Sequence, residues 1–127
     1  MEVYVGGCGQ GKLQYVLEKR KVTRKDIVDG ADLSPDQTEG FKVINHFHLF
    51  IRQWVDDPQI VYRYLDTLSE KNAGVILICD QVGGGVIPIE KKERDWRELV
   101  GRVMCIAVKQ SDHVERIVCG LGQVLKG

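Results

Sequence analysis

Two periodicities of apolar and polar positions alternate along the chain. Short apolar runs, typical of buried strands, are separated by segments in which apolar residues recur every three or four positions, typical of helices with one buried face. The strand patterns fall at residues 3–5, 41–45, 75–79, 114–119 and 123–126. The helical patterns fall at residues 12–21, at a segment running through Trp54 and Val55, at 60–71 and at 91–108. This alternation predicts an α/β fold with a mostly parallel sheet covered by helices.

Length and charge narrow the class of protein. The 127 residues predict a single domain, residues 1–127, and the 18 basic and 18 acidic residues cancel. A balanced chain has no electrostatic footprint for nucleic acid or for an anionic membrane. No apolar run reaches the roughly 18–20 residues that span a bilayer, and no secretory signal is visible, so we expect a cytoplasmic protein.

The four cysteines are widely spaced and form no C-x-x-C pair. In a chain without a leader this spacing predicts reduced thiols, mostly buried, and neither a disulfide framework nor a zinc site.

The first predicted loop carries the clearest chemical signal. Residues 6–12, GGCGQGK, have the spacing G-x-x-x-x-G-K between a strand and a helix. In such a loop, backbone N–H groups and the helix N-terminus surround phosphate oxygens, and Lys12 can reach the outer phosphates. The next residue normally offers a hydroxyl to Mg²⁺, which Leu13 lacks. The loop therefore predicts nucleotide binding and does not by itself predict catalysis; the alternative is an ordinary glycine turn before a helix.

Asp80 directly follows the apolar run 75–79. Open parallel sheets bind ligands at the carboxyl ends of their strands, so Asp80 could hold Mg²⁺ in the manner of a Walker-B acid. The alternative is an aspartate that begins a turn before glycines.

Further motifs make the whole pattern specific. Residues 81–88, QVGGGVIP, resemble E-V-G-x-G-[IV]-[IV]-P, and residues 94–98, RDWRE, resemble R-x-[FY]-R-[DE]. Residues 43–51, VINHFHLFI, are similar to L-L-D-C-L-T-x-W-L, and the loop GGCGQGK to G-G-x-x-S-G-K-S. In this order the motifs resemble those of the adenosylcobinamide kinase/adenosylcobinamide-phosphate guanylyltransferase family of cobalamin biosynthesis.

The resemblance implies a P-loop NTPase-like, three-layer α/β/α fold and a homotrimer. It implies two activities: phosphorylation of the aminopropanol hydroxyl of adenosylcobinamide, and addition of GMP from GTP through a guanylylated histidine. The implied ligands are GTP or ATP, Mg²⁺ and the corrinoid. The expected nucleotide-binding residues are Gly6, Gly7, Cys8, Gly9, Gln10, Gly11, Lys12, Leu13, Asn45 and Arg97.

Several positions depart from the family pattern. Leu13 replaces the metal-binding serine, and Asn45 and Gln81 replace carboxylates, whereas Asp80 restores one carboxylate where many members have asparagine. Because phosphoryl transfer depends on Mg²⁺ to neutralise phosphate charge, these losses predict impaired kinase activity. Residues 22–40 are too short for the family's second strand and its H-x-x-H-x-x-x-R-P stretch, which carries the GMP-accepting histidine.

His46 and His48 remain as candidates near the loop. An imidazole there could take up GMP or a metal, although two histidines at this spacing are more often a structural pair. The candidate catalytic residues are therefore Lys12, Asp80, His46 and His48, with Asp80 as the metal ligand. We expect a shortened family member that binds a purine nucleotide; the alternatives are a non-catalytic nucleotide sensor and a structural domain without nucleotide affinity.

Overall fold

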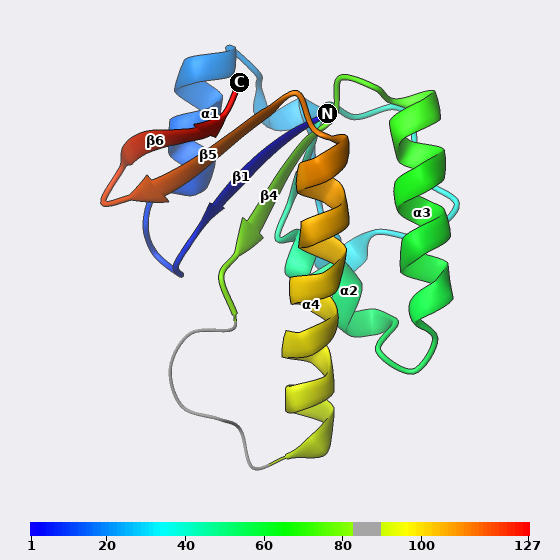
Figure 1. Cartoon of the computed structure of the whole chain (residues 1–127). Coiled ribbons are helices and arrows are strands. Elements are labelled where there is room, and N and C mark those ends of the chain that lie inside the picture. The colour runs from blue at the N-terminus through cyan, green and yellow to red at the C-terminus, as the bar shows by residue number, and fades with distance from the viewer. Residues whose placement is uncertain (83–89) are drawn as a thin grey trace.

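One six-stranded sheet organises the part of the chain that the computed structural model describes, residues 1–82 and 90–127. The strands are β1 (Glu2–Gly6), β2 (Ile27–Asp29), β3 (Val43–Asn45), β4 (Ile76–Asp80), β5 (His113–Val118) and β6 (Leu121–Lys126). Their order is β2-β3-β4-β1-β5-β6, with parallel pairing throughout except for the antiparallel β5–β6 hairpin (Figure 1). The predicted mostly parallel sheet is confirmed.

Helices form at or near the four predicted segments, but the second ends at Gln53, so Trp54 and Val55 lie in the turn after it and not in the helix as predicted. The helices are α1 (Lys12–Arg20), α2 (Phe47–Gln53), α3 (Pro58–Lys71) and α4 (Lys91–Gln110), with short 3₁₀ turns η1 (Arg24–Asp26) and η2 (Gly30–Asp32). Pro58 occupies the first turn of α3, where its missing N–H leaves no helical hydrogen bond unmade. Trp96, Leu99 and Val103 form part of the buried face of α4.

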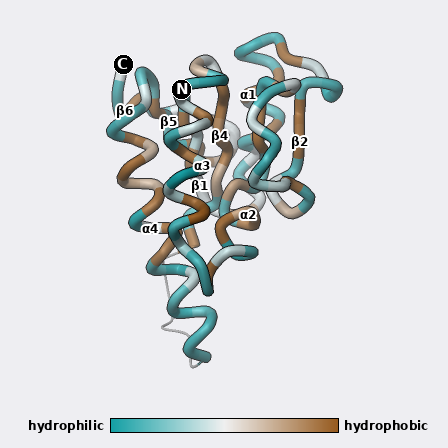
Figure 2. The backbone as a smooth tube through the Cα atoms, turned by 90° about the vertical axis from the view of Figure 1, so that its right-hand side faces the viewer, coloured by the Kyte–Doolittle hydropathy of each residue, from teal (hydrophilic) through white to brown (hydrophobic). Residues whose placement is uncertain are grey.

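Alternate residues of the strands face opposite layers. Val3 of β1 packs into the core cluster formed with α2, α3 and α4, whereas Tyr4 packs with Val16 of α1 on the other face. The sheet thus lies between α1 and the three other helices, which confirms the three-layer α/β/α architecture. In Figure 2 the N-terminal part of α4 is mainly hydrophilic.

Residues 22–40 gave no strand pattern, and they were expected to be too short for the family's second strand and its histidine-bearing stretch; the structure nevertheless forms a strand there, β2. This strand lies at the edge of the sheet and pairs with β3 alone, from Ile27 opposite Val43 to Asp29 opposite Asn45. An edge strand of three residues needs only a short apolar run, which is too short to give a periodicity in the sequence.

The expectation of mostly buried cysteines is also wrong. All four are free thiols, but Cys8, Cys105 and Cys119 are exposed and Cys79 alone is buried. Cys8 and Cys119 lie in turns, and Cys105 is on the outer face of α4, where local sequence gives no sign of exposure.

Among the described residues, none of the helices combines the length and the hydropathy that a membrane span requires. Most of the QVGGGVIP motif, residues 83–88, lies outside the described part of the chain.

Candidate functional site

The glycine-rich loop leaves β1 at Gly6 and enters α1 at Lys12. Gly11 precedes the helix in the left-handed region, with φ of 82°, which glycine adopts without steric penalty. At Gly6 a Cβ atom would lie 2.5 Å from the carbonyl oxygen of Ile117 in β5, so only glycine fits beside that strand. The loop therefore takes its sharp turn because its glycines permit both the conformation and the close approach.

The turn between β5 and β6 holds the loop in place. The Gly120 N–H donates to the Gln10 carbonyl oxygen over 2.8 Å. The Cys119 N–H donates to Gln10 Oε1 over 2.7 Å. The side chain of Gln10 is thus occupied by the hairpin, and the loop contributes to a ligand site mainly through its backbone.

Lys12 and Asp80 form the charged centre of the site. Lys12 Nζ lies 2.7 Å from Asp80 Oδ1 and donates to the Gly7 carbonyl oxygen over 2.8 Å, while its side chain is 7% exposed. The two residues meet because β1 and β4 are neighbours in register, with Gly6 opposite Asp80 at their carboxyl ends. The structure thus brings together the cation and the carboxylate that the sequence assigned to one phosphate site.

His48 is bound to Asp80 through both ring nitrogens. The Asp80 N–H donates to Nδ1 over 3.1 Å, and Nε2 lies 3.4 Å from Asp80 Oδ2. Burial lowers the pKa of His48, outweighing the nearby Asp80 carboxylate. Since Nδ1 accepts a hydrogen bond, the neutral ring carries its proton on Nε2 and donates toward the carboxylate. These contacts make His48 a residue that orients Asp80.

His46 occupies a different environment. It precedes α2 with φ of 55°, and its side chain is 43% exposed. Its Nδ1 lies 2.8 Å from Asp29 Oδ2, at the end of β2. No sequence pattern singled out Asp29, because the contact depends on β2 pairing with β3, and β2 gave no periodicity of its own.

Most of the predicted site residues surround one hollow of about 310 Å³. Its lining comprises Cys8, Gly9, Gln10, Gly11, Lys12, Leu13, Gln14, Asn45, His46 and Asp80. Gly6 and Gly7 precede this lining in the same loop. A nucleotide's phosphates would therefore meet the loop backbone on one side and the ends of β3 and β4 on the other.

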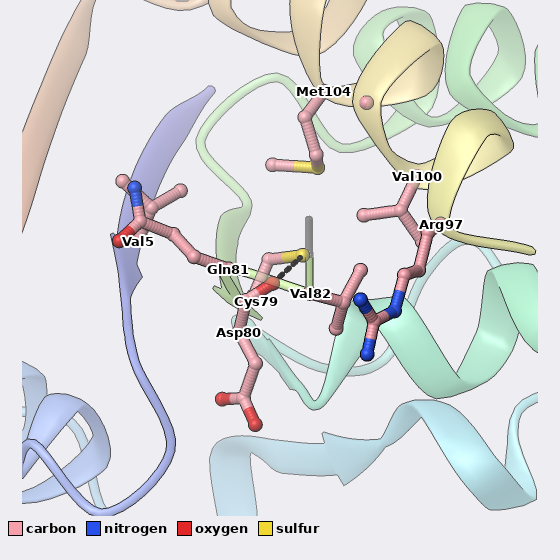
Figure 3. A pocket seen from close by; sticks show the side chains of 9 residues that line it. Val5, Cys79, Asp80, Gln81, Val82, Arg97, Val100 and Met104 are labelled. Atoms are coloured by element: carbon pink, nitrogen blue, oxygen red, sulfur yellow. Dashed lines mark hydrogen bonds between the residues drawn. The ribbon is translucent and has the colours of Figure 1, made fainter. Parts of the chain in front are cut away.

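Two predicted site residues, His48 and Arg97, do not line this hollow. Arg97 extends from α4 into a neighbouring hollow of about 390 Å³ with a mainly apolar wall that includes Cys79, Val100 and Met104. Asp80 lines both hollows. In Figure 3 its carboxylate points away from Met104 and Val100, on the side of the site opposite these apolar groups.

Asp80 is the carboxylate among the described residues that line the hollow beside the glycine-rich loop, and it could hold Mg²⁺ there. Leu13 packs against the cluster of apolar residues between α1 and the sheet, and its side chain has no oxygen to offer. The described residues include no group of three or more histidine, cysteine, aspartate or glutamate side chains suited to a metal ion. Mg²⁺ commonly binds one or two carboxylates together with water and substrate phosphates, so a single carboxylate fits that mode.

The central β1 strand, the loop of residues 6–12 and the acid at the end of β4 define the class as a P-loop NTPase-like α/β protein. The profile of the cobinamide kinase / cobinamide phosphate guanyltransferase family matches residues 43–125, well over half of the chain. The chain belongs to this family, which supports a role in cobalamin biosynthesis and a chemistry of the kinase or transferase kind. A comparison with curated proteins found no match. The family match begins at Val43 and does not include the loop at residues 6–12.

Proposed function

We propose that this chain binds a purine nucleoside triphosphate, GTP or ATP, in the hollow between the glycine-rich loop and the ends of β3 and β4. The observation that supports this most directly is the placement of Lys12 and Asp80 at the mouth of the loop, 2.7 Å apart. The lysine is within reach of phosphates held by the loop backbone, and the carboxylate is within reach of a cation bound to them.

The ion pair makes the proposed binding dependent on a cation. Phosphate oxygens entering the hollow compete with Asp80 for Lys12, and they are repelled by the carboxylate. Mg²⁺ held by Asp80 would neutralise charge on the phosphates. Asn45 offers an amide oxygen but no charge at the neighbouring strand end.

Two functions are open to such a site. The first is phosphoryl transfer to a corrinoid such as adenosylcobinamide, supported by the family to which the chain belongs. The second is a nucleotide sensor without catalysis, favoured by the packing of Leu13 in place of a hydroxyl ligand. We favour nucleotide binding with weakened transfer, and without guanylyl transfer by the family's histidine. We also propose that the protein is cytoplasmic.

We also propose that the chain forms a homotrimer. Large apolar side chains are exposed along the β5–β6 hairpin, at Val118, Leu121, Val124 and Leu125. Exposed apolar groups that gather on one element are typical of an interface between subunits.

Calorimetry of GTP and ATP binding, each with and without Mg²⁺, tests the proposed function. We predict that Lys12→Ala weakens nucleotide affinity by at least about 1 kcal/mol, roughly the contribution of a hydrogen bond to a charged group. Lys25→Ala, which removes an exposed lysine from η1, is the matched control and leaves the affinity unchanged. A wild-type protein with no nucleotide affinity at millimolar concentrations would contradict the proposal.

A further inference from the structure

Asp29 and His46 form a carboxylate–imidazole pair at the edge of the proposed nucleotide site. Asp29 Oδ2 lies 2.8 Å from His46 Nδ1, and Asp29 Oδ1 accepts the Ala31 N–H over 2.9 Å. Partial burial alone would raise the pKa of Asp29, but the hydrogen bonds from Ala31 and His46 lower it below its usual range. The carboxyl group is therefore ionised near neutral pH and can only accept hydrogen bonds.

An ionised partner fixes the tautomer of the neutral His46 ring. Because Asp29 Oδ2 can only accept, Nδ1 carries the hydrogen, and the lone pair is on Nε2. No other described residue forms a hydrogen bond or ion pair with Nε2. The outer nitrogen of the ring is thus in the form that accepts a proton.

The backbone holds this pair firmly in position. A Cβ atom on Gly30 would overlap the carbonyl oxygen of His46, so the turn after β2 packs directly against the start of α2. Gln53 Nε2 donates to the Gly30 and Ala31 carbonyl oxygens over 2.7 and 3.1 Å, which joins the end of α2 to the same turn. His46 itself keeps a positive φ, a conformation that is uncommon outside glycine and recurs at functional sites.

Location separates His46 from the other two histidines of the chain. His46 lines the hollow beside the glycine-rich loop. His48 is buried with both nitrogens facing Asp80. His113 Nε2 lies 2.6 Å from Glu115, beneath α1. His46 is therefore the histidine that has a ring nitrogen available beside the glycine-rich loop.

We propose that His46, oriented by Asp29, is the general base for phosphoryl transfer at this site; the inference rests on the proposed nucleotide binding. Nε2 takes the proton of an acceptor hydroxyl while the hydroxyl oxygen forms a bond to the γ-phosphorus. The bond from that phosphorus to the bridging oxygen breaks, and its electron pair leaves with the nucleoside diphosphate. The imidazolium that results is stabilised by Asp29 and later releases its proton to solvent.

His46→Asn and Asp29→Asn test the two roles, with cobinamide as the acceptor and γ-labelled GTP or ATP as the donor. Asparagine tolerates the positive φ of residue 46, so the first variant keeps the backbone. In the second, an amide that donates to Nδ1 favours the tautomer with hydrogen on Nε2. Asp32→Asn, which neutralises an exposed carboxylate of η2, is the matched control.

We expect nucleotide affinity to change by less than about threefold in all three variants. The transfer rate falls roughly 10²–10⁴-fold in His46→Asn, as on loss of a general base, falls less in Asp29→Asn, and is unchanged in Asp32→Asn. The wild-type rate rises with pH through one deprotonation, and this dependence disappears in His46→Asn. The charged and titratable groups around the ring are Asp29 on β2, His48 on α2, and Lys12 and Asp80 across the hollow, so the pH profile is compared with those of His48→Asn and Asp80→Asn.

Binding and transfer separate the outcomes. Nucleotide binding without any transfer to cobinamide overturns the inference and leaves the proposed binding function intact. The same holds for a His46→Asn variant that transfers phosphate at the wild-type rate. Absence of nucleotide binding overturns both.

Discussion

At the scale of single residues, the pairing of Lys12 with Asp80 governs how the site responds to charge. Lys12 is 7% and Asp80 18% exposed, so each charge is largely removed from water and depends on the other. His48 donates toward the same carboxylate from a buried position. A ligand that draws Lys12 away therefore has to leave Asp80 with another positive partner, and a divalent cation is the one that a nucleotide brings with it.

We predict that Asp80→Asn strengthens nucleotide binding measured without Mg²⁺ and removes most of the Mg²⁺ effect. Asparagine keeps an acceptor for His48 but no longer competes for the Lys12 ammonium or repels phosphate, so the Mg²⁺-free affinity should rise about tenfold. Calorimetry across Mg²⁺ concentrations measures both effects. Asp66→Asn, on the exposed face of α3, is the control, and an unchanged Mg²⁺ response in Asp80→Asn would show that the cation binds elsewhere.

Leu13 occupies the position at which a P-loop normally offers a hydroxyl ligand to Mg²⁺. We predict that Leu13→Ser increases the Mg²⁺ dependence of nucleotide binding, because its hydroxyl supplies the ligand that the leucine side chain lacks. Leu13 also packs between α1 and the sheet, so the substitution reduces stability. Leu13→Ala is the matched control, since it loses the same packing without gaining an oxygen. Equal Mg²⁺ responses in the folded serine and alanine variants would contradict the proposed geometry.

At the scale of elements, local pattern predicted the long helices and the central strands. The run that becomes β4 and the helical spacing of α4 each carry several apolar residues, which is enough for periodicity to register. Lys12 and Asp80 could be placed together because both follow strands, and the carboxyl ends of parallel strands meet at one edge. The pair of Asp29 and His46 could not, because it depends on the alignment of β2 with β3 across the chain.

Helix α1 is joined to β5 by a buried carboxylate. Glu115 is 1% exposed and accepts hydrogen bonds from Tyr15 and Lys19 of α1 and from His113 of β5. Burial alone raises the pKa of Glu115, but the bonds from Lys19, Tyr15 and His113 outweigh it and lower the pKa to about 2. The folded state therefore binds this proton less readily than the unfolded chain, whose glutamates titrate near 4.3.

The depressed pKa of Glu115 predicts a dependence of stability on pH. Its contribution is complete above about pH 5 and is lost as the pH falls through the unfolded value toward about 2. Glu115→Gln should lower the free energy of unfolding at pH 7 by on the order of 2 kcal/mol. The difference from wild type should shrink on acidification, measured by urea unfolding at decreasing pH. Glu98→Gln, in an exposed pair with Arg102, should show neither effect, whereas a pH-independent loss in Glu115→Gln would mean that packing dominates.

At the scale of the whole molecule, separate parts of the chain meet around one loop. β1 delivers the loop, the β5–β6 turn holds Gln10, β4 supplies Asp80, and β3 with the start of α2 supplies Asn45 and His46. Figure 1 shows how the order of the sheet places β1 between β4 and β5, so that both neighbours can reach the loop that follows it. The site therefore depends on the order of the strands in the sheet.

Residues 22–40, where the resemblance to the family places the GMP-accepting histidine, include no histidine. His48 has both ring nitrogens at Asp80, His113 has its Nε2 at Glu115, and we assign His46 to proton transfer. We therefore predict that incubation with α-labelled GTP leaves no acid-labile, base-stable phosphoramidate on the protein.

Label present in the wild type and absent in His46→Asn would identify a relocated nucleophile and replace the role of base that we propose for this ring. Label lost in His48→Asn would mean that this buried ring becomes accessible when nucleotide binds. Label that survives both substitutions would indicate His113 or an amine such as Lys12 and would move the active centre away from the pair of Asp29 and His46.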